Sequence, residues 1–259
     1  MKKTLLILIA LVLCTPIIIF AADVPLTSAG QVPSLAAPTG PGSFLGSCGT
    51  INQSGSYVLV RNLQTTGDCL LVLADWVTID LNGFVISGSG TGSGIGSAQL
   101  GRTGITVRNG TIRGFSAGID FAFNGGQMLV EKMRLFNNVN YGVGTNDSSV
   151  VKDCIATGNG IGFFLGSRSV VTGNTANFNQ DGFSINVGST VIGNTAGNNS
   201  RDGFQTQNGV TVVNNTAFAN GRYGFLREGG NFVANTATLS GVADVMGGAN
   251  NSVNNVPSP

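Results

Sequence analysis

The feature that most constrains this chain is a repeat of 20 to 21 residues in its C-terminal half. A Gly-Phe pair recurs in step with the tripeptide Asn-Thr-Ala, and a third column of Asn keeps the same spacing. The pairs begin at Gly162, Gly182, Gly203 and Gly224, the tripeptides at Asn174, Asn194, Asn215 and Asn235, and the third column holds Asn159, Asn179, Asn199 and Asn220. Three patterns with one period indicate repeated structural units that stack on one another.

The repeat predicts an all-β, single-domain right-handed parallel β-helix. Its segments are short and β-branched, and they lack the 3.6-residue periodicity of an amphipathic helix. We expect about nine or ten coils, three short strands per coil, and neighbouring coils about 4.8 Å apart. Identical residues then form ladders: an internal stack of Phe side chains, and Asn side chains that bond the backbone at the bends. The Phe stack comprises Phe163, Phe183, Phe204 and Phe225.

Two other solenoids share part of this pattern. A leucine-rich repeat has a similar period and an Asn column but needs several Leu per repeat. Between residues 150 and 235 only Leu165 and Leu226 occur. A left-handed β-helix is built from hexapeptides, so three of them give a period near ~18 residues. Neither alternative fits the observed spacing.

The composition excludes several kinds of catalytic and binding site. The 259-residue chain contains 40 Gly and no His, and only 10% of its residues are charged, against about 25% in an average domain. Without His, a His-dependent metal site or triad is excluded, and we expect no metal and no cofactor. Basic and acidic residues number 13 and 12, so we expect no nucleic-acid partner.

The chain divides into four segments by composition. Residues 1–22 read as a signal peptide, with Lys2 and Lys3 before an apolar run that ends at Ala21-Ala22. This predicts a secreted or periplasmic protein with no membrane span in the mature chain, and a retained anchor is the alternative. Residues 23–46 are expected to be a flexible leader, 47–250 the β-helix, and 251–259 a C-terminal tail.

Two local features of the predicted β-helix can be placed in advance. The Gly- and Ser-rich segment 87–102 is expected to protrude as a loop. The Asn-Gly pairs that begin at Asn82 and Asn109 are expected to close strands as turns.

The cysteines fit the same repeat. Cys48 and Cys69 are 21 residues apart, which is one coil, so they could form a disulfide between adjacent coils in an oxidising compartment. Cys154 aligns with the column of Asn174, where we expect a buried structural thiol.

These residues resemble the right-handed parallel β-helix superfamily, which includes pectate lyases, polygalacturonases and a periplasmic protein of copper-enzyme maturation. The likeness is carried by the Asn-Thr-Ala and Gly-Phe repeat and by residues 55–59 and 77–84, which are similar to the opening coils of uncharacterised exported β-helix proteins. It covers most of residues 47–250 and implies fold rather than chemistry. The catalytic motifs of polygalacturonases and the calcium-binding Asp cluster of pectate lyases are missing.

One group of residues could nevertheless carry chemistry. Asp181 and Asp202 stand at the same repeat position on adjacent coils, which predicts carboxyl groups about 5 Å apart, as in a retaining glycosidase. Arg201 and Arg222 lie beside them and could bind a uronic acid or sulfate, and Tyr223 could stack on a sugar ring. The alternative is that each Asp forms an ordinary turn whose charge the neighbouring Arg relieves.

Three functions follow from these observations. The first is an exported scaffold whose surface contacts polysaccharide. The second is a polysaccharide lyase or glycoside hydrolase that uses Asp181 and Asp202. The third is a structural or adhesive surface protein, distinguished by self-association without glycan.

Overall fold

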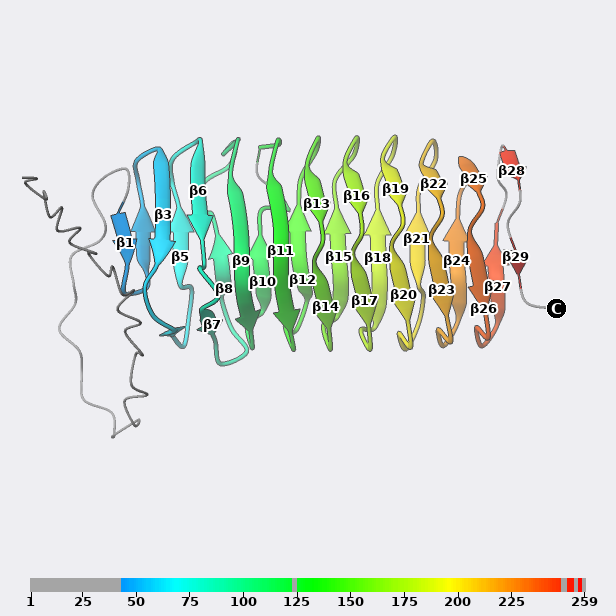
Figure 1. Ribbon diagram of the computed structural model, residues 1–259, viewed down its shortest axis with the longest axis horizontal. Helices are drawn as coiled ribbons and strands as arrows, with labels where there is room; N and C mark the ends of the chain where they lie inside the picture. The colour runs from blue at the N-terminus through cyan, green and yellow to red at the C-terminus, as the bar shows by residue number, and fades with distance from the viewer. Residues whose placement is uncertain (1–42, 123–124, 248–250, 254–255, 258–259) are drawn as a thin grey trace, which may run out of the picture. The chain divides into compact units, whose positions relative to one another are not determined.

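The computed structural model describes residues 43–122, 125–247, 251–253 and 256–257. The predicted signal peptide and the part of the predicted leader before residue 43 lie outside these ranges. Within them every regular element is a β-strand, and neighbouring coils pair in parallel (Figure 1). The predicted parallel β-helix is confirmed. No helix in the described part of the chain has the length and apolarity needed to cross a membrane.

One side of every coil belongs to a ten-stranded sheet, with one strand per coil. In order, its strands are β2 (Gly49–Ile51), β5 (Leu70–Val72), β8 (Ser93–Gly96), β10 (Ala117–Asp120), β12 (Tyr141–Thr145), β15 (Ile161–Leu165), β18 (Asp181–Ile185), β21 (Phe204–Thr206), β24 (Tyr223–Arg227) and β27 (Ala243–Met246).

The other two sides form a 19-stranded sheet that bends along its length into two rows. The first row holds β1 (Ser43–Leu45), β3 (Gly55–Leu59), β6 (Val77–Asp80), β13 (Val150–Lys152), β16 (Val170–Thr172), β19 (Thr190–Ile192), β22 (Thr211–Val213), β25 (Asn231–Val233) and β28 (Asn251–Val253). The second row holds β4 (Leu63–Gln64), β7 (Val85–Ser87), β14 (Ile155–Thr157), β17 (Thr175–Asn177), β20 (Thr195–Gly197), β23 (Thr216–Phe218), β26 (Thr236–Thr238) and β29 (Val256–Pro257). Two longer strands run through the bend and join the rows, β9 (Thr106–Arg113) and β11 (Leu129–Phe136).

The strands extend beyond the predicted β-helix at both ends. Ser43 to Leu45 of the expected leader pair with β3, because Leu45 buries its side chain in the core. In the expected tail, β28 pairs with β25, and Pro257 is tolerated in β29, the last strand of its row. A proline can occupy such an edge because, in the described part of the chain, no further strand needs its missing N–H.

The coils between Leu70 and Val143 are longer than the repeat predicts. Paired residues in the ten-stranded sheet are 20 or 21 positions apart after Val143, but 24 apart from Ile95 to Ile119 and 25 from Leu70 to Ile95. The segment 87–102 contains β8, so its prediction as one protruding loop is wrong. Asn82 and Gly83 form the expected turn, with positive φ at both residues. At Asn109 the prediction is wrong, because β9 continues through it as a bend.

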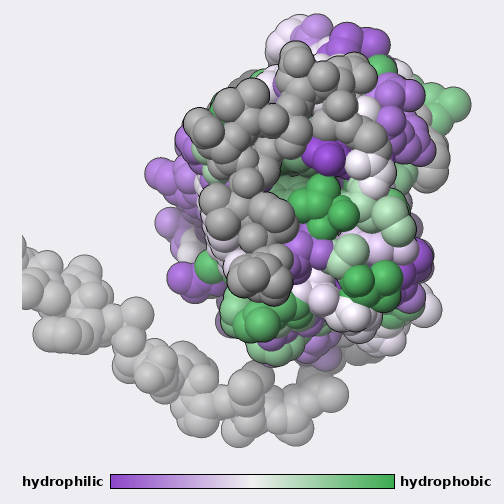
Figure 2. All heavy atoms as spheres, turned by 90° about the vertical axis from the view of Figure 1, so that its right-hand side faces the viewer, coloured by the Kyte–Doolittle hydropathy of each residue, from purple (hydrophilic) through white to green (hydrophobic). Residues whose placement is uncertain are grey.

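The core consists of ladders that run from coil to coil. The four predicted Phe rings stack with centroids 4.7 to 4.9 Å apart and interplanar angles of at most 13°. Two buried Asn ladders satisfy the backbone at two bends. In the first, the backbone N–H of Asn174 donates to Oδ1 of Asn194 at 2.9 Å, and its Nδ2 donates to the carbonyl of Val151. Figure 2 views the C-terminal end of the stack, where hydrophobic side chains occupy the interior and much of the rim is hydrophilic.

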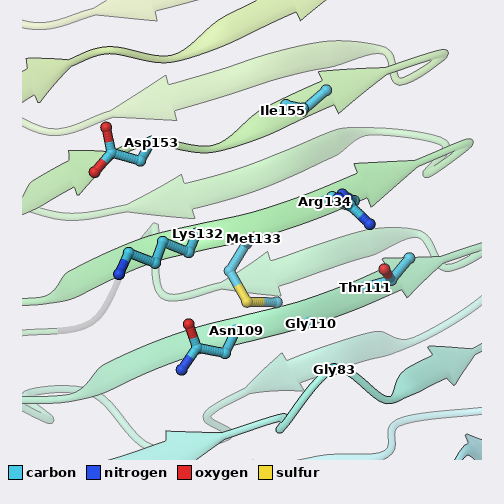
Figure 3. Close-up of a pocket in the computed structure, with 9 residues that line it drawn as sticks. All are labelled: Gly83, Asn109, Gly110, Thr111, Lys132, Met133, Arg134, Asp153 and Ile155. Atoms are coloured by element: carbon cyan, nitrogen blue, oxygen red, sulfur yellow. The ribbon is translucent and has the colours of Figure 1, made fainter.

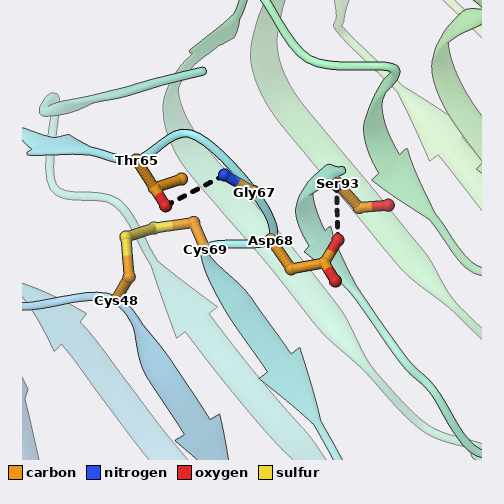
Figure 4. Close-up of a disulfide and its surroundings, with 6 residues drawn as sticks. All are labelled: Cys48, Thr65, Gly67, Asp68, Cys69 and Ser93. Atoms are coloured by element: carbon orange, nitrogen blue, oxygen red, sulfur yellow. Dashed lines mark hydrogen bonds between the residues drawn. A yellow bond between two sulfur atoms is a disulfide. The ribbon is translucent and has the colours of Figure 1, made fainter. Parts of the chain in front are cut away.

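The cysteines occupy the places that the repeat indicates. Cys48 and Cys69 form a disulfide between adjacent coils, with Cα atoms 4.5 Å apart (Figure 4). Cys154 is buried in the first Asn ladder, and its backbone N–H donates to Oδ1 of Asn174 at 3.0 Å. Burial raises the pKa of its thiol to about 12, so this thiol is an unreactive core group.

Candidate functional site

The outward face of the ten-stranded sheet brings the candidate residues together. Asp181, Asp202 and Tyr223 occupy one column of this face. Asp181 begins β18, Asp202 lies two residues before the first residue of β21, and Tyr223 begins β24. Arg201 and Arg222 precede Asp202 and Tyr223 in the turns that lead into these strands. All five predicted residues therefore lie in one region.

The carboxylate of Asp202 accepts four hydrogen bonds from three residues. Its carboxylate accepts hydrogen bonds from Nε of Arg222 at 2.8 Å, from Nη2 of Arg222, from Nε2 of Gln205 at 2.8 Å and from the backbone N–H of Tyr223 at 3.2 Å. Its side chain has 0% exposure. Burial by itself raises the pKa of this carboxyl, but the donors from Arg222 and Gln205 outweigh burial and lower the pKa below its ordinary value.

Asp181 lies one coil earlier and has fewer partners. Its Oδ1 accepts the backbone N–H of Asp202 at 3.2 Å, and its Oδ2 lies 3.5 Å from Nη1 of Arg201. The side chain is only 6% exposed. Because burial outweighs the Asp202 N–H bond and the charge of Arg201, the pKa of Asp181 is raised.

Each carboxylate thus bonds the backbone of the following coil, and each has an arginine beside it. This arrangement caps the turn and compensates charge, as the turn interpretation of Asp181 and Asp202 expects. It leaves little carboxylate surface for a substrate. Arg222 also lies over the ring of Tyr223, with 5.0 Å between its Cζ and the ring centroid.

The same face also carries an aromatic pair that the sequence pattern did not predict. Tyr141 pairs with Ile161 in the column that continues to Asp181, and its ring lies against Gly144, where a Cβ would come within 2.5 Å of the ring. Its hydroxyl donates to Oδ1 of Asp120 at 2.7 Å. Burial, and then this bond to Asp120, raise the pKa of Tyr141. Gly144 is therefore required for the ring to lie flat on the sheet.

Phe164 completes this pair, which we call the aromatic platform (Tyr141 and Phe164). The two rings lie 6.0 Å apart between centroids at an interplanar angle of 27°, and both are half-buried. The signal for Phe164 was present in the sequence, since Phe164 follows the inward Phe163 and strand alternation turns it outward.

Polar side chains continue the column of Phe164 along the sheet. Ser184 and Gln205 follow it on β18 and β21, and Leu226 comes next on β24. These three residues help to line a groove of about 130 Å³. Rings, hydroxyl and amide groups thus form one track across adjacent coils. Among the described residues, no three Cys, Asp or Glu side chains gather in a way that could hold a metal ion.

In the comparisons with known proteins, matches come from solved structures. No family model matches the chain, and no curated protein matches it. A crystal structure of a double mutant of the periplasmic alginate epimerase AlgG is similar over 80% of this chain and 76% of its own, with 11% sequence identity and a TM-score of 0.43.

Proposed function

We propose that this chain is an exported protein that binds polysaccharide on the outward face of its ten-stranded sheet and does not cleave it. The observation that carries the proposal is the aromatic platform beside the track of Ser184 and Gln205. Half-buried aromatic rings offer an apolar face to the C–H side of a sugar, while neighbouring hydroxyl and amide groups bond its oxygens.

The spacing of the coils favours a polymer over a single sugar. Candidate contacts recur along the sheet every ~4.8 Å, the distance between neighbouring strands. Tyr141 and Tyr223 are four coils apart, which places these two aromatic residues roughly 19 Å from each other along the stack. A glycan chain that follows the stack would meet the platform, Gln205 and Tyr223 in turn.

Export is supported by two features of the chain. The segment 1–22 has the composition of a signal peptide. The disulfide between Cys48 and Cys69 belongs in an oxidising compartment, such as the periplasm or the cell exterior.

The test is affinity electrophoresis of the mature protein through gels that contain neutral or acidic polysaccharides. Phe164→Ser should weaken retardation about two- to tenfold, because an aromatic contact contributes roughly 0.5–1.5 kcal/mol beyond its area. The fold should accept this change, since Gly144 and Ser184 occupy the same position on the adjacent coils.

The matched control is Val170→Ser, which also removes an outward apolar side chain, 39% exposed, but on the 19-stranded sheet. It should migrate as wild type. Equal retardation of wild type and Phe164→Ser in every gel would refute the proposed face.

A second candidate is a lyase or hydrolase centred on Asp181 and Asp202. The observation that favours it is that Asp181 and Asp202 lie on adjacent coils, where Oδ1 of Asp181 accepts the Asp202 N–H at 3.2 Å. Their pKa values are displaced in opposite directions, as they are where one carboxyl acts as an acid while another stays ionised. New reducing ends or unsaturated products, lost in Asp181→Asn, would support an enzyme. Product formation that persists in Asp181→Asn would remove these residues from the reaction.

A further inference from the structure

A groove of about 350 Å³ lies on the 19-stranded sheet, at the bend where its two rows meet. Strands β9 and β11 form its floor. Figure 3 shows Asn109, Lys132 and Asp153 on one side of the bend and Thr111, Arg134 and Ile155 on the other. Its volume falls within the range of small-molecule sites.

The groove exists because two coils have bends of different length. Asp80 pairs with Arg108, and Val85 pairs with Thr111. Between these paired positions one coil has four residues, 81–84, whereas the next coil has only two, 109 and 110. The longer bend carries the turn at Asn82 and Gly83, and Gly83 lines the groove at that end. Gly110 is required in the floor, since a Cβ there would collide with Leu81.

The groove has an excess of positive charge. Within the described ranges no carboxylate forms an ion pair with Lys132 or Arg134, and both side chains are exposed. The neighbouring acids on β6 and β11 are already paired with cations. Asp80 pairs with Arg108 at 2.9 Å, and Glu131 pairs with Lys152 at 3.0 Å.

One carboxylate, Asp153, lines the groove beside the two cations. Together with Asn109 and Thr111 it offers oxygen atoms that can accept hydrogen bonds from ligand hydroxyls. The side chains therefore match a ligand that carries both an anionic oxygen group and several hydroxyls.

The positive surface continues along the second row. Arg113 lies on β9 two residues after Thr111 and also lines a second groove of about 270 Å³, together with Ser87 and Asn137. Its Nε donates to Oγ of Ser87 at 3.2 Å, and no acid of the described chain pairs with it. Two residues of a strand span roughly 7 Å, so an oligosaccharide can reach from one groove to the other.

We propose that this pair of grooves is a binding site for an anionic saccharide, whose carboxylate or sulfate groups are held by Lys132, Arg134 and Arg113. The site is on the 19-stranded sheet and does not depend on the proposed polysaccharide-binding face of the ten-stranded sheet. The anionic group bonds the cations, and the sugar hydroxyls bond Asn109, Thr111 and Asp153.

Isothermal titration calorimetry of the mature protein tests the site with three probes: a galacturonate oligomer, a sulfated oligosaccharide and inorganic sulfate. At least one of the two saccharides should bind, and its Kd should rise with ionic strength because exposed charges are screened. The double variant Lys132→Gln/Arg134→Gln should weaken its binding at least tenfold, while its retardation in gels of neutral polysaccharide should stay that of wild type. Which saccharide binds then identifies carboxylate or sulfate as the recognised group.

The matched control is Arg168→Gln, which removes one exposed cation at a different bend, where it pairs with Asp147. It should bind the saccharide as wild type does. An equal loss in Arg168→Gln would reduce the effect to general charge and overturn the site. Failure of both saccharides to bind, or inorganic sulfate binding as tightly as they do, would overturn it as well. Loss of calorimetric binding in the double variant, with wild-type retardation in gels of neutral polysaccharide, would separate the two proposals.

Discussion

Replacing one residue of the second Asn ladder measures how much the ladders stabilise the coils. In Asn199, Oδ1 accepts the backbone N–H of Asn179 at 3.0 Å, and Nδ2 donates to the carbonyl of Ala176 at 3.1 Å. The same amide also accepts Nδ2 of Asn179 at 3.1 Å and donates to Oδ1 of Asn220 at 2.9 Å. Asn199→Ala removes all four bonds in a site closed to water. A buried group left without its partner costs about 1–3 kcal/mol, so we expect the free energy of unfolding to fall by about 2–4 kcal/mol.

Urea unfolding and amide hydrogen exchange together check this value. The unfolding midpoint should fall, and the amide of Asn179 should lose protection more than amides of distant coils. The matched control, Asn177→Ala, changes a half-buried outward Asn with no hydrogen bond of its side chain among the described residues, and should stay within about 0.5 kcal/mol of wild type. If Asn199→Ala is as stable as Asn177→Ala, the reasoning is refuted.

Three further substitutions and one labelling experiment have definite expected outcomes. Asp181→Asn should stabilise the protein at neutral pH and lose that advantage below about pH 4, because the raised pKa of Asp181 means that folding favours its protonated form. Asp202→Asn should destabilise the protein by about 2–3 kcal/mol at neutral pH. The difference in the free energy of unfolding between wild type and variant should shrink as the pH falls towards the lowered pKa of Asp202, where the wild-type carboxylate becomes protonated. Urea titrations across pH check both variants. Phe204→Ala should cost about 3–5 kcal/mol by calorimetry, since it opens a cavity between two stacked rings. In the mature chain Cys154 should react with a thiol reagent only after unfolding, and reaction in the native state would contradict its burial.

The C-terminal coils were predictable because their ladders require identical residues. An Asn ladder forms only if each coil has an Asn at the same position, and stacked rings likewise favour Phe at the same position of each coil. Identical residues therefore recur once per coil, and the sequence shows the period directly. In the N-terminal coils the same core column holds Leu70, Ile95, Ile119 and Val143. Apolar volume alone is required there, and bends of varying length hide the period.

The positions of the candidate site residues on the coils were predictable, but the burial and hydrogen-bond partners of their side chains were not. The spacing of Asp181 and Asp202 correctly places them on adjacent coils. Their burial and partners depend on how the side chains of Arg222 and Gln205 fold over Asp202, which no spacing rule describes. The aromatic platform escaped detection because it needs the absence of a side chain at Gly144 as much as the presence of Tyr141.

Hydroxyl-radical footprinting with saturating polysaccharide, chosen from the gel that retards the protein most, tests the central claim most directly. If the ten-stranded sheet binds glycan, oxidation of Tyr141 and Phe164 should fall while oxidation of Phe178 stays unchanged. Phe178 is 64% exposed in the bend that follows β17. Protection of Phe178 with undiminished oxidation of Tyr141 and Phe164 would contradict the claim and place the glycan on another face.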